Sequence, residues 1–113
     1  MEVSCHCGNV KLTIVQKPTE ITECDCSICR RYAALWGYFS PCDVTINTGA
    51  QGTTPYIWGD REVAFHHCNS CGCITHYVST KRCSIERTAV NMRMATSEQL
   101  KGIALRKING ALY

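Results

Sequence analysis

The cysteines are the residues of this sequence best suited to chemistry. There are ten of them in 113 residues, and eight gather in three short clusters. The clusters are Cys5-x-Cys7, Cys24-x-Cys26-x-x-Cys29 and Cys68-x-x-Cys71-x-Cys73. A disulfide framework spreads its cysteines so that they join distant loops, whereas short spacings are typical of metal sites. The spacing therefore favours metal binding, and thiolate ligands favour zinc over harder ions.

Two of the cysteine pairs suit one closed metal site. Cys5 and Cys7 lie two residues apart, so in an extended chain both side chains point to the same face. Cys68 and Cys71 have the spacing of a knuckle, in which a tight turn brings two sulfurs to one metal. A glycine that permits a left-handed turn follows each pair. Together the pairs supply four thiolates, enough for a tetrahedral zinc site that ties the N-terminal strand to the middle of the chain.

The remaining cluster differs in both number and neighbours. Cys24, Cys26 and Cys29 lie within six residues, and Arg30-Arg31 follows where the other pairs have glycine. Three local ligands leave one coordination position open, as in catalytic zinc sites. The two arginines could bind an anionic ligand or a thiolate substrate, or they could only offset the charge of the zinc–thiolate group.

Other residues leave the second site ambiguous. Cys73 could join the three-cysteine cluster as a fourth ligand, which would make both sites closed and structural. The histidines are further candidates for a fourth ligand or a proton carrier, although such histidines more often only satisfy a hydrogen bond. They are His6, His66, His67 and His76. Cys42 and Cys83 stand alone and are interpreted as ordinary small apolar residues.

Alternating apolar residues predict a mostly β fold around these clusters. Strands are expected at 10–14, within 33–39 and at 44–46, followed by an exposed loop at 47–52 and a hairpin formed by 56–58 and 63–65. The clearest alternation runs over 87–94, and the face that carries Arg87 is expected to be solvated in preference to facing a substrate. A capping box at Thr96 to Gln99 and apolar residues at helical spacing as far as Ile108 predict one short C-terminal helix.

Length and charge limit the function classes. A chain of 113 residues, 45% of them hydrophobic, predicts one domain over residues 1–113. Neither a long apolar run nor a signal-peptide pattern is found, so we expect a soluble cytoplasmic protein without membrane contact. The formal charge of +3 falls to zero if seven thiolates bind two divalent ions. Nucleic acid is therefore not an expected partner.

The ordered motifs resemble a known family. Cys5-x-Cys7-Gly8-x-Val10, Cys24-x-Cys26-Ser27-x-Cys29-Arg30-Arg31 and Phe65-x-x-Cys68-x-x-Cys71-Gly72 resemble the glutathione-dependent formaldehyde-activating enzyme family, which also contains centromere protein V. The resemblance extends to Ile108-Asn109-Gly110. It implies the small zinc-bound β-tent fold and two Zn²⁺ ions per chain. It also implies a structural zinc on Cys5, Cys7, Cys68 and Cys71, and a second, open zinc on Cys24, Cys26 and Cys29.

The resemblance implies an activity as well. The family reversibly adds formaldehyde to glutathione, giving S-hydroxymethylglutathione, and is classed as a carbon–sulfur lyase. A lyase-like reaction of a small thiol such as glutathione at the open zinc is accordingly the leading hypothesis. One alternative is a non-catalytic interaction module with two structural zinc sites. Another is a thiol-based redox sensor that uses Cys73 and the Cys24 cluster.

Overall fold

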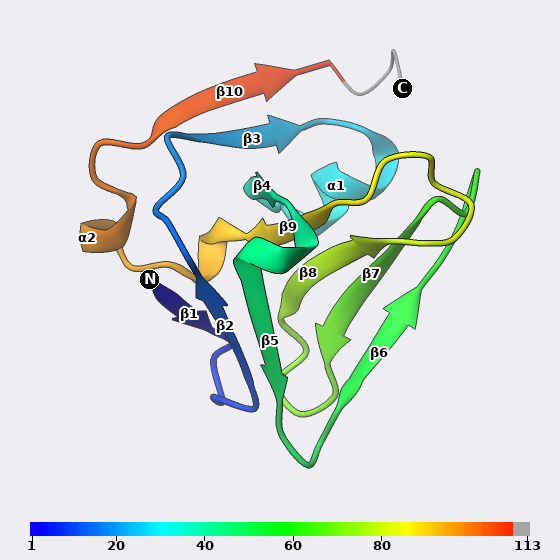
Figure 1. Cartoon of the computed structure of the whole chain (residues 1–113), viewed down its shortest axis with the longest axis horizontal. Coiled ribbons are helices and arrows are strands. Elements are labelled where there is room, and N and C mark those ends of the chain that lie inside the picture. The colour runs from blue at the N-terminus through cyan, green and yellow to red at the C-terminus, as the bar shows by residue number, and fades with distance from the viewer. Residues whose placement is uncertain (110–113) are drawn as a thin grey trace.

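The protein folds into two β-sheets with two short helices, as the computed structural model in Figure 1 shows; it describes residues 1–109. The first sheet has the strand order β1-β2-β5, and the second has the order β10-β3-β4-β9-β8-β7-β6. The strands and helices have the following bounds: β1 Glu2–Ser4, β2 Val10–Ile14, β3 Glu20–Cys24, α1 Ser27–Tyr32, β4 Trp36–Phe39, β5 Val44–Thr48, β6 Thr53–Tyr56, β7 Val63–Cys68, β8 Ile74–Ser79, β9 Thr88–Asn91, α2 Ser97–Leu100 and β10 Ala104–Ile108. The predicted mostly β fold is confirmed.

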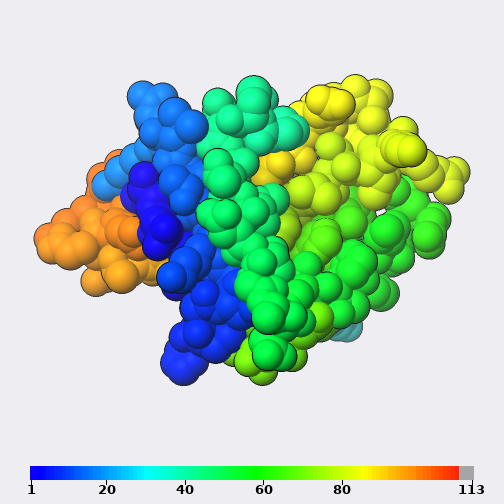
Figure 2. Space-filling view, turned by 60° about the horizontal axis from the view of Figure 1, so that its bottom comes forward, coloured from blue at the N-terminus to red at the C-terminus, as the bar shows by residue number. Residues whose placement is uncertain are grey.

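The small sheet packs its apolar face against one face of the large sheet. Strand β2 alternates buried and exposed residues, and Val10, Leu12 and Ile14 are at most 1% exposed. They share a buried cluster with Val90 and Met92, which extend this core into the large sheet. Figure 2 shows the hairpin β1–β2 and strand β5 side by side on the outside of this layer. The alternation that predicted the strand over 10–14 thus marks the core face correctly.

The opposite face of the large sheet has a second core, which α1 covers. This aromatic cluster includes Trp36, Phe65 and Tyr77 together with Cys29 of α1. The ring of Trp36 lies 4.9 Å from that of Tyr77 in an edge-on arrangement, and Phe65 lies 5.3 Å from Tyr77. Tyr32 of α1 packs edge-on against Phe65, with ring centroids 5.5 Å apart, so aromatic packing holds α1 on this face of the sheet.

Strand β9 is buried on both faces, so the prediction of a solvated face over 87–94 is wrong. Ala89 is fully buried in the aromatic cluster, while Val90 is fully buried in the core between the sheets. The strand also ends earlier than predicted, because residues 92–94 form a 3₁₀ turn. A central strand covered on both sides needs no polar face.

The C-terminal helix is shorter than its apolar spacing predicted. The capping box forms, with the Thr96 hydroxyl accepting from the Gln99 N–H and the Gln99 side chain accepting from the Thr96 N–H. Gly102 adopts a left-handed conformation with φ of 80° and ends the helical path. Residues 104–108 then pair in parallel with β3, so they form a strand and not the predicted helix.

Helix α1, over Ser27–Tyr32, was not predicted from the sequence.

Within residues 1–109, neither helix is long and apolar enough to span a membrane. The hairpin predicted from 56–58 and 63–65 exists, but its first strand is β6 and lies earlier in the chain. Gly110, the last residue of the family resemblance, lies outside the described residues.

Candidate functional site

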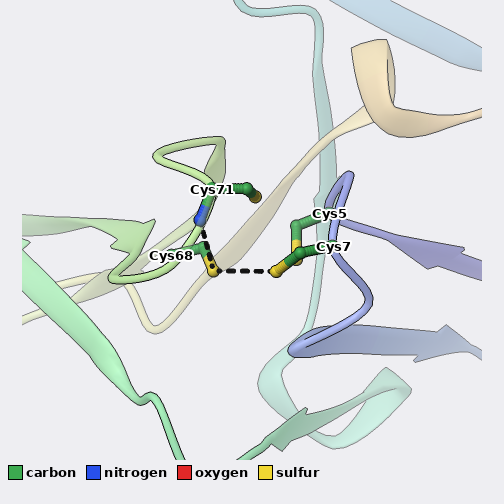
Figure 3. Close-up of side chains that lie close together, drawn as sticks. All are labelled: Cys5, Cys7, Cys68 and Cys71. Carbon is green, nitrogen blue, oxygen red and sulfur yellow. Dashed lines mark hydrogen bonds between the residues drawn. The ribbon is translucent and has the colours of Figure 1, made fainter.

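Two turns from distant parts of the chain bring four cysteines together (Figure 3). Cys5 and Cys7 come from the turn between β1 and β2, and Cys68 and Cys71 come from the turn between β7 and β8. All four sulfurs lie within 4.8 Å of one another. The Sγ of Cys7 is 3.7 Å from that of Cys5 and 3.6 Å from that of Cys68.

These distances fit a tetrahedral metal ion. A zinc–sulfur bond of about 2.3 Å places neighbouring ligand sulfurs about 3.8 Å apart at the corners of a tetrahedron. The distances from Cys7 Sγ to the sulfurs of Cys68 and Cys5, 3.6 and 3.7 Å, agree with that edge length. The four-cysteine group is therefore already shaped for one zinc ion.

Donors around the sulfurs support their thiolate form. The backbone N–H of Val10 donates to Cys5 Sγ at 3.3 Å, and the N–H of Ser70 donates to Cys68 Sγ at 3.3 Å. The side-chain amide of Asn9 also donates to Cys68 Sγ at 3.3 Å. Such outer partners orient metal ligands, and Asn9 is one that the sequence analysis did not identify.

Cys5 and Cys71 differ in acidity before metal binds. A hydrogen bond from the Cys73 N–H lowers the pKa of Cys71 to about 5, so this residue is already a thiolate at neutral pH. Burial raises the pKa of Cys5 to about 11. Metal binding at neutral pH must therefore release the proton of Cys5.

The three-cysteine group lies where β3 leads into α1. Cys24 is the last residue of β3, Cys26 is the N-cap of α1, and Cys29 lies in its first turn. Their sulfurs lie within 4.8 Å of one another. In the described part of the chain, this group includes no fourth cysteine, histidine or carboxylate. One metal ion could accordingly bind three thiolates and keep one position for another ligand.

Two donors fix the sulfurs of this group. The Cys29 N–H donates to Cys26 Sγ at 3.4 Å, which is the usual hydrogen bond of a helix N-cap. The indole N–H of Trp36 donates to Cys29 Sγ at 3.3 Å. Burial raises the pKa of Cys29. At Cys26 burial acts in the same direction, but the hydrogen bonds from the backbone and from the neighbouring cysteines together outweigh it, and the pKa falls.

The remaining candidate ligands lie elsewhere. Cys73 belongs to neither group, and it lies beside Cys71, on the side of the four-cysteine group. His66 and His76 stack with ring centroids 4.7 Å apart, and each has its Nδ1 hydrogen-bonded to a threonine hydroxyl. None of the four histidines is part of either metal-binding group within the described residues. Cys42 is 3.1 Å from the Ser40 hydroxyl, and the Cys83 thiol donates to the Ile85 carbonyl.

Two hollows adjoin the three-cysteine group. A larger one, of about 680 Å³, is lined by Cys24, Cys26, Arg30 and Trp58. Arg31 does not line it, and its guanidinium instead donates to the Ser27 carbonyl at 2.8 Å.

The smaller hollow has a volume of about 400 Å³. Besides Cys24 and Cys29, it is lined by polar residues that the sequence analysis did not select, namely Tyr38, Tyr77, Arg87 and Arg106. The three-cysteine group therefore lies beside space of the size that small ligands occupy.

Comparison with known proteins agrees with this geometry. The sequence profile of a family described as glutathione-dependent formaldehyde-activating enzyme matches residues 1–105. The chain belongs to this family. A Halomonas elongata protein named "Putative glutathione-dependent formaldehyde-activating enzyme" is 38% identical over 61 residues, which cover 50% of this chain and 39% of that protein.

A solved structure of another protein shares the fold of this chain. A crystal structure of a Rhodobacter sphaeroides protein matches 93% of this chain and 99% of its own chain, with a TM-score of 0.73 and 27% identity. The family resemblance stated from the cysteine motifs is confirmed, and the match to the family covers both cysteine groups.

Proposed function

We propose that the chain is a two-zinc protein that binds a small thiol at Cys24, Cys26 and Cys29 and catalyses reversible addition of formaldehyde to glutathione. In this reaction the glutathione sulfur forms a bond to the formaldehyde carbon, and the thiol proton ends on the former carbonyl oxygen. The observation that carries the proposal is the three-thiolate group beside two hollows. Family membership supports the same substrate pair.

The chemistry needs an open coordination position. Zinc on three thiolates supplies a Lewis acid, which lowers the pKa of a bound thiol or polarises an aldehyde oxygen. The protein's own residues set the geometry: Trp36 fixes the sulfur of Cys29, and the N-cap hydrogen bond fixes that of Cys26. Val63 and Phe65 line both hollows and make this part of the wall apolar.

The other assignments follow from the same chemistry. Cys5, Cys7, Cys68 and Cys71 hold the structural zinc, because four thiolates fill a tetrahedral ion and leave no position for a substrate. All ten cysteines are free thiols, which suits a cytoplasmic protein. We place the whole chain, residues 1–113, in one domain.

Calorimetry tests the proposal directly. Glutathione is titrated into protein verified to contain two zinc ions per chain, and then into Cys29→Ser and Cys42→Ser. We expect saturable binding to the parent protein and to Cys42→Ser, whose altered residue is exposed and outside both groups. Binding should be lost in Cys29→Ser, which has one ligand fewer at the open site.

A second measurement separates catalysis from binding. Exchange NMR follows formaldehyde entering and leaving S-hydroxymethylglutathione, with the uncatalysed rate subtracted. Faster exchange with the parent protein but not with Cys29→Ser is the expected result. Binding without faster exchange would leave a thiol-binding module, and a parent protein that does not bind glutathione would contradict the proposal.

A further inference from the structure

The smaller hollow lies on one face of the large sheet. The register of the strands shows that the lining residues share this face. Tyr38 pairs with Ala89, and Ala89 pairs with Tyr77, so these three side chains lie on the same side of the sheet. Arg87 precedes Ala89 by two residues and projects on the same side. At the far edge, Ile108 pairs with Cys24, and Arg106 lies two residues before Ile108. Five strands therefore contribute to one polar-edged hollow beside the cysteines.

Arg87 is held in place within this hollow. Its guanidinium lies over the Tyr38 ring, 4.6 Å from the ring centroid, and donates to the Tyr77 hydroxyl at 3.4 Å. The side chain is half-buried. A planar guanidinium fixed by an aromatic ring and a phenol is pre-organised for recognition of a carboxylate.

Among residues 1–109, neither Arg87 nor Arg106 forms an ion pair with an acidic side chain. The ion pairs found within residues 1–109 join Lys101 to Glu98 and Lys107 to Glu23, both on the surface. The described residues that line the smaller hollow include no aspartate or glutamate. Its positive charge is therefore not neutralised by protein carboxylates among the described residues.

Cys24 and Cys29 line the same hollow as the two arginines, and their thiolates disfavour a ligand whose negative charge is not compensated. Three thiolates on a divalent ion have a net charge of −1, so a bound thiolate with a second negative charge needs nearby cations. We infer that Arg87 and Arg106 form a carboxylate subsite, which selects small thiols that carry a carboxylate within a few bonds of the sulfur. This inference rests on the proposed function, because the sulfur of the same molecule would occupy the open position at Cys24, Cys26 and Cys29.

A matched pair of thiols tests the subsite. 3-Mercaptopropionate and 3-mercaptopropionamide have the same length and thiol, and only the first carries a negative charge. Each is titrated calorimetrically into the two-zinc protein. We expect the acid to bind about tenfold more tightly than the amide or better, because hydrogen bonds to ionised groups in a partly buried site are the strong ones.

Variants assign the difference to particular residues. In Arg87→Gln and in Arg106→Gln the advantage of the acid should fall severalfold, while the affinity for the amide stays the same. Lys11→Gln is the matched control, since it removes one positive charge from an exposed position on the other sheet and should keep the full advantage. Zinc content is measured for each variant and should remain two per chain.

The outcomes separate this inference from the proposed function. If the amide binds and the acid binds no better, the thiol site stands and the carboxylate subsite is refuted, and the arginines only offset the charge of the thiolates. Equal loss of both thiols in Arg87→Gln would also refute it, because the arginine would then only hold the hollow in shape. If neither thiol binds to the two-zinc protein, the proposed function and the subsite both fail.

Discussion

The two cysteine groups should contribute unequally to stability, and the sequence separation of their ligands gives the difference. In the four-cysteine group Cys7 and Cys68 are 61 residues apart, whereas Cys24 and Cys29 are separated by five. A metal that joins the ends of a longer loop removes more entropy from the unfolded chain, in proportion to (3/2)RT ln n. The ratio of 61 to five corresponds to about 2 kcal/mol.

Two substitutions compare the groups on equal terms. Cys71→Ser removes one ligand from the four-cysteine group, and Cys26→Ser removes one from the three-cysteine group. Cys26 is also the N-cap of α1, but serine is itself a favoured N-cap residue, so the helix keeps its cap. We expect each variant to lose one zinc, and Cys71→Ser to lose about 2 kcal/mol more free energy of unfolding than Cys26→Ser.

Urea unfolding followed by circular dichroism measures the free energies, and elemental analysis of the same samples counts the zinc. Cys42→Ser, at an exposed position outside both groups, is the control and should unfold like the parent protein. A Cys71→Ser chain that does not fold agrees with the reasoning only if Cys26→Ser still folds. Equal decreases in both variants, with one zinc lost from each, would refute it.

Three further predictions concern residues around the two groups. Trp36→Phe removes the indole donor to Cys29 and should weaken metal binding at the three-cysteine group about 10–100-fold, with the other zinc unchanged. Competition with a chelator measures this affinity, and an unaltered value would contradict a role for the indole donor. In Gly49→Ala the new Cβ would lie 2.6 Å from the Asn9 side-chain oxygen, so thermal unfolding should show a loss of about 1–3 kcal/mol, and no loss would mean that Asn9 moves aside freely. Burial lowers the pKa of His76 to about 4, whereas the pKa of a histidine in the unfolded chain is 6.5. As the pH falls, His76 is therefore protonated in the unfolded chain before it is protonated in the folded protein, and the folded protein loses stability below about pH 6.5. Between pH 7 and pH 5 the free energy of unfolding should fall about 2 kcal/mol less in His76→Gln than in the parent protein, and parallel pH profiles would contradict this.

The sequence predicted correctly those features of the structure that depend only on residues close together in the chain. The alternation of Val10, Leu12 and Ile14 gives β2 and its buried face, because the period of a strand is a property of the chain itself. The three-cysteine group was predictable for the same reason, because Cys24, Cys26 and Cys29 need only one turn of chain to meet. The capping box at Thr96 is also local, and it formed as expected.

The errors came from features that depend on the rest of the fold. Helix α1 begins at Ser27, and its N-cap is Cys26. Cysteine is not among the usual N-cap residues, so the sequence had no start signal at that position. Residues 104–108 have helical spacing, but pairing with β3 outweighs that preference. The hollow with Arg87 and Arg106 depends on the order of strands in the sheet, which spacing along the chain does not contain.

The burial of β9 on both faces has a consequence for natural variation and for protein engineering. Val90 faces the layer between the sheets, and Ala89 faces the aromatic cluster beside the three-cysteine group. Substitutions at Val90 therefore act on the packing between the sheets, and those at Ala89 act on the aromatic cluster that supports the three-cysteine group. A library of variants at Ala89 would therefore change the surroundings of the three-cysteine group while the core between the two sheets stays constant.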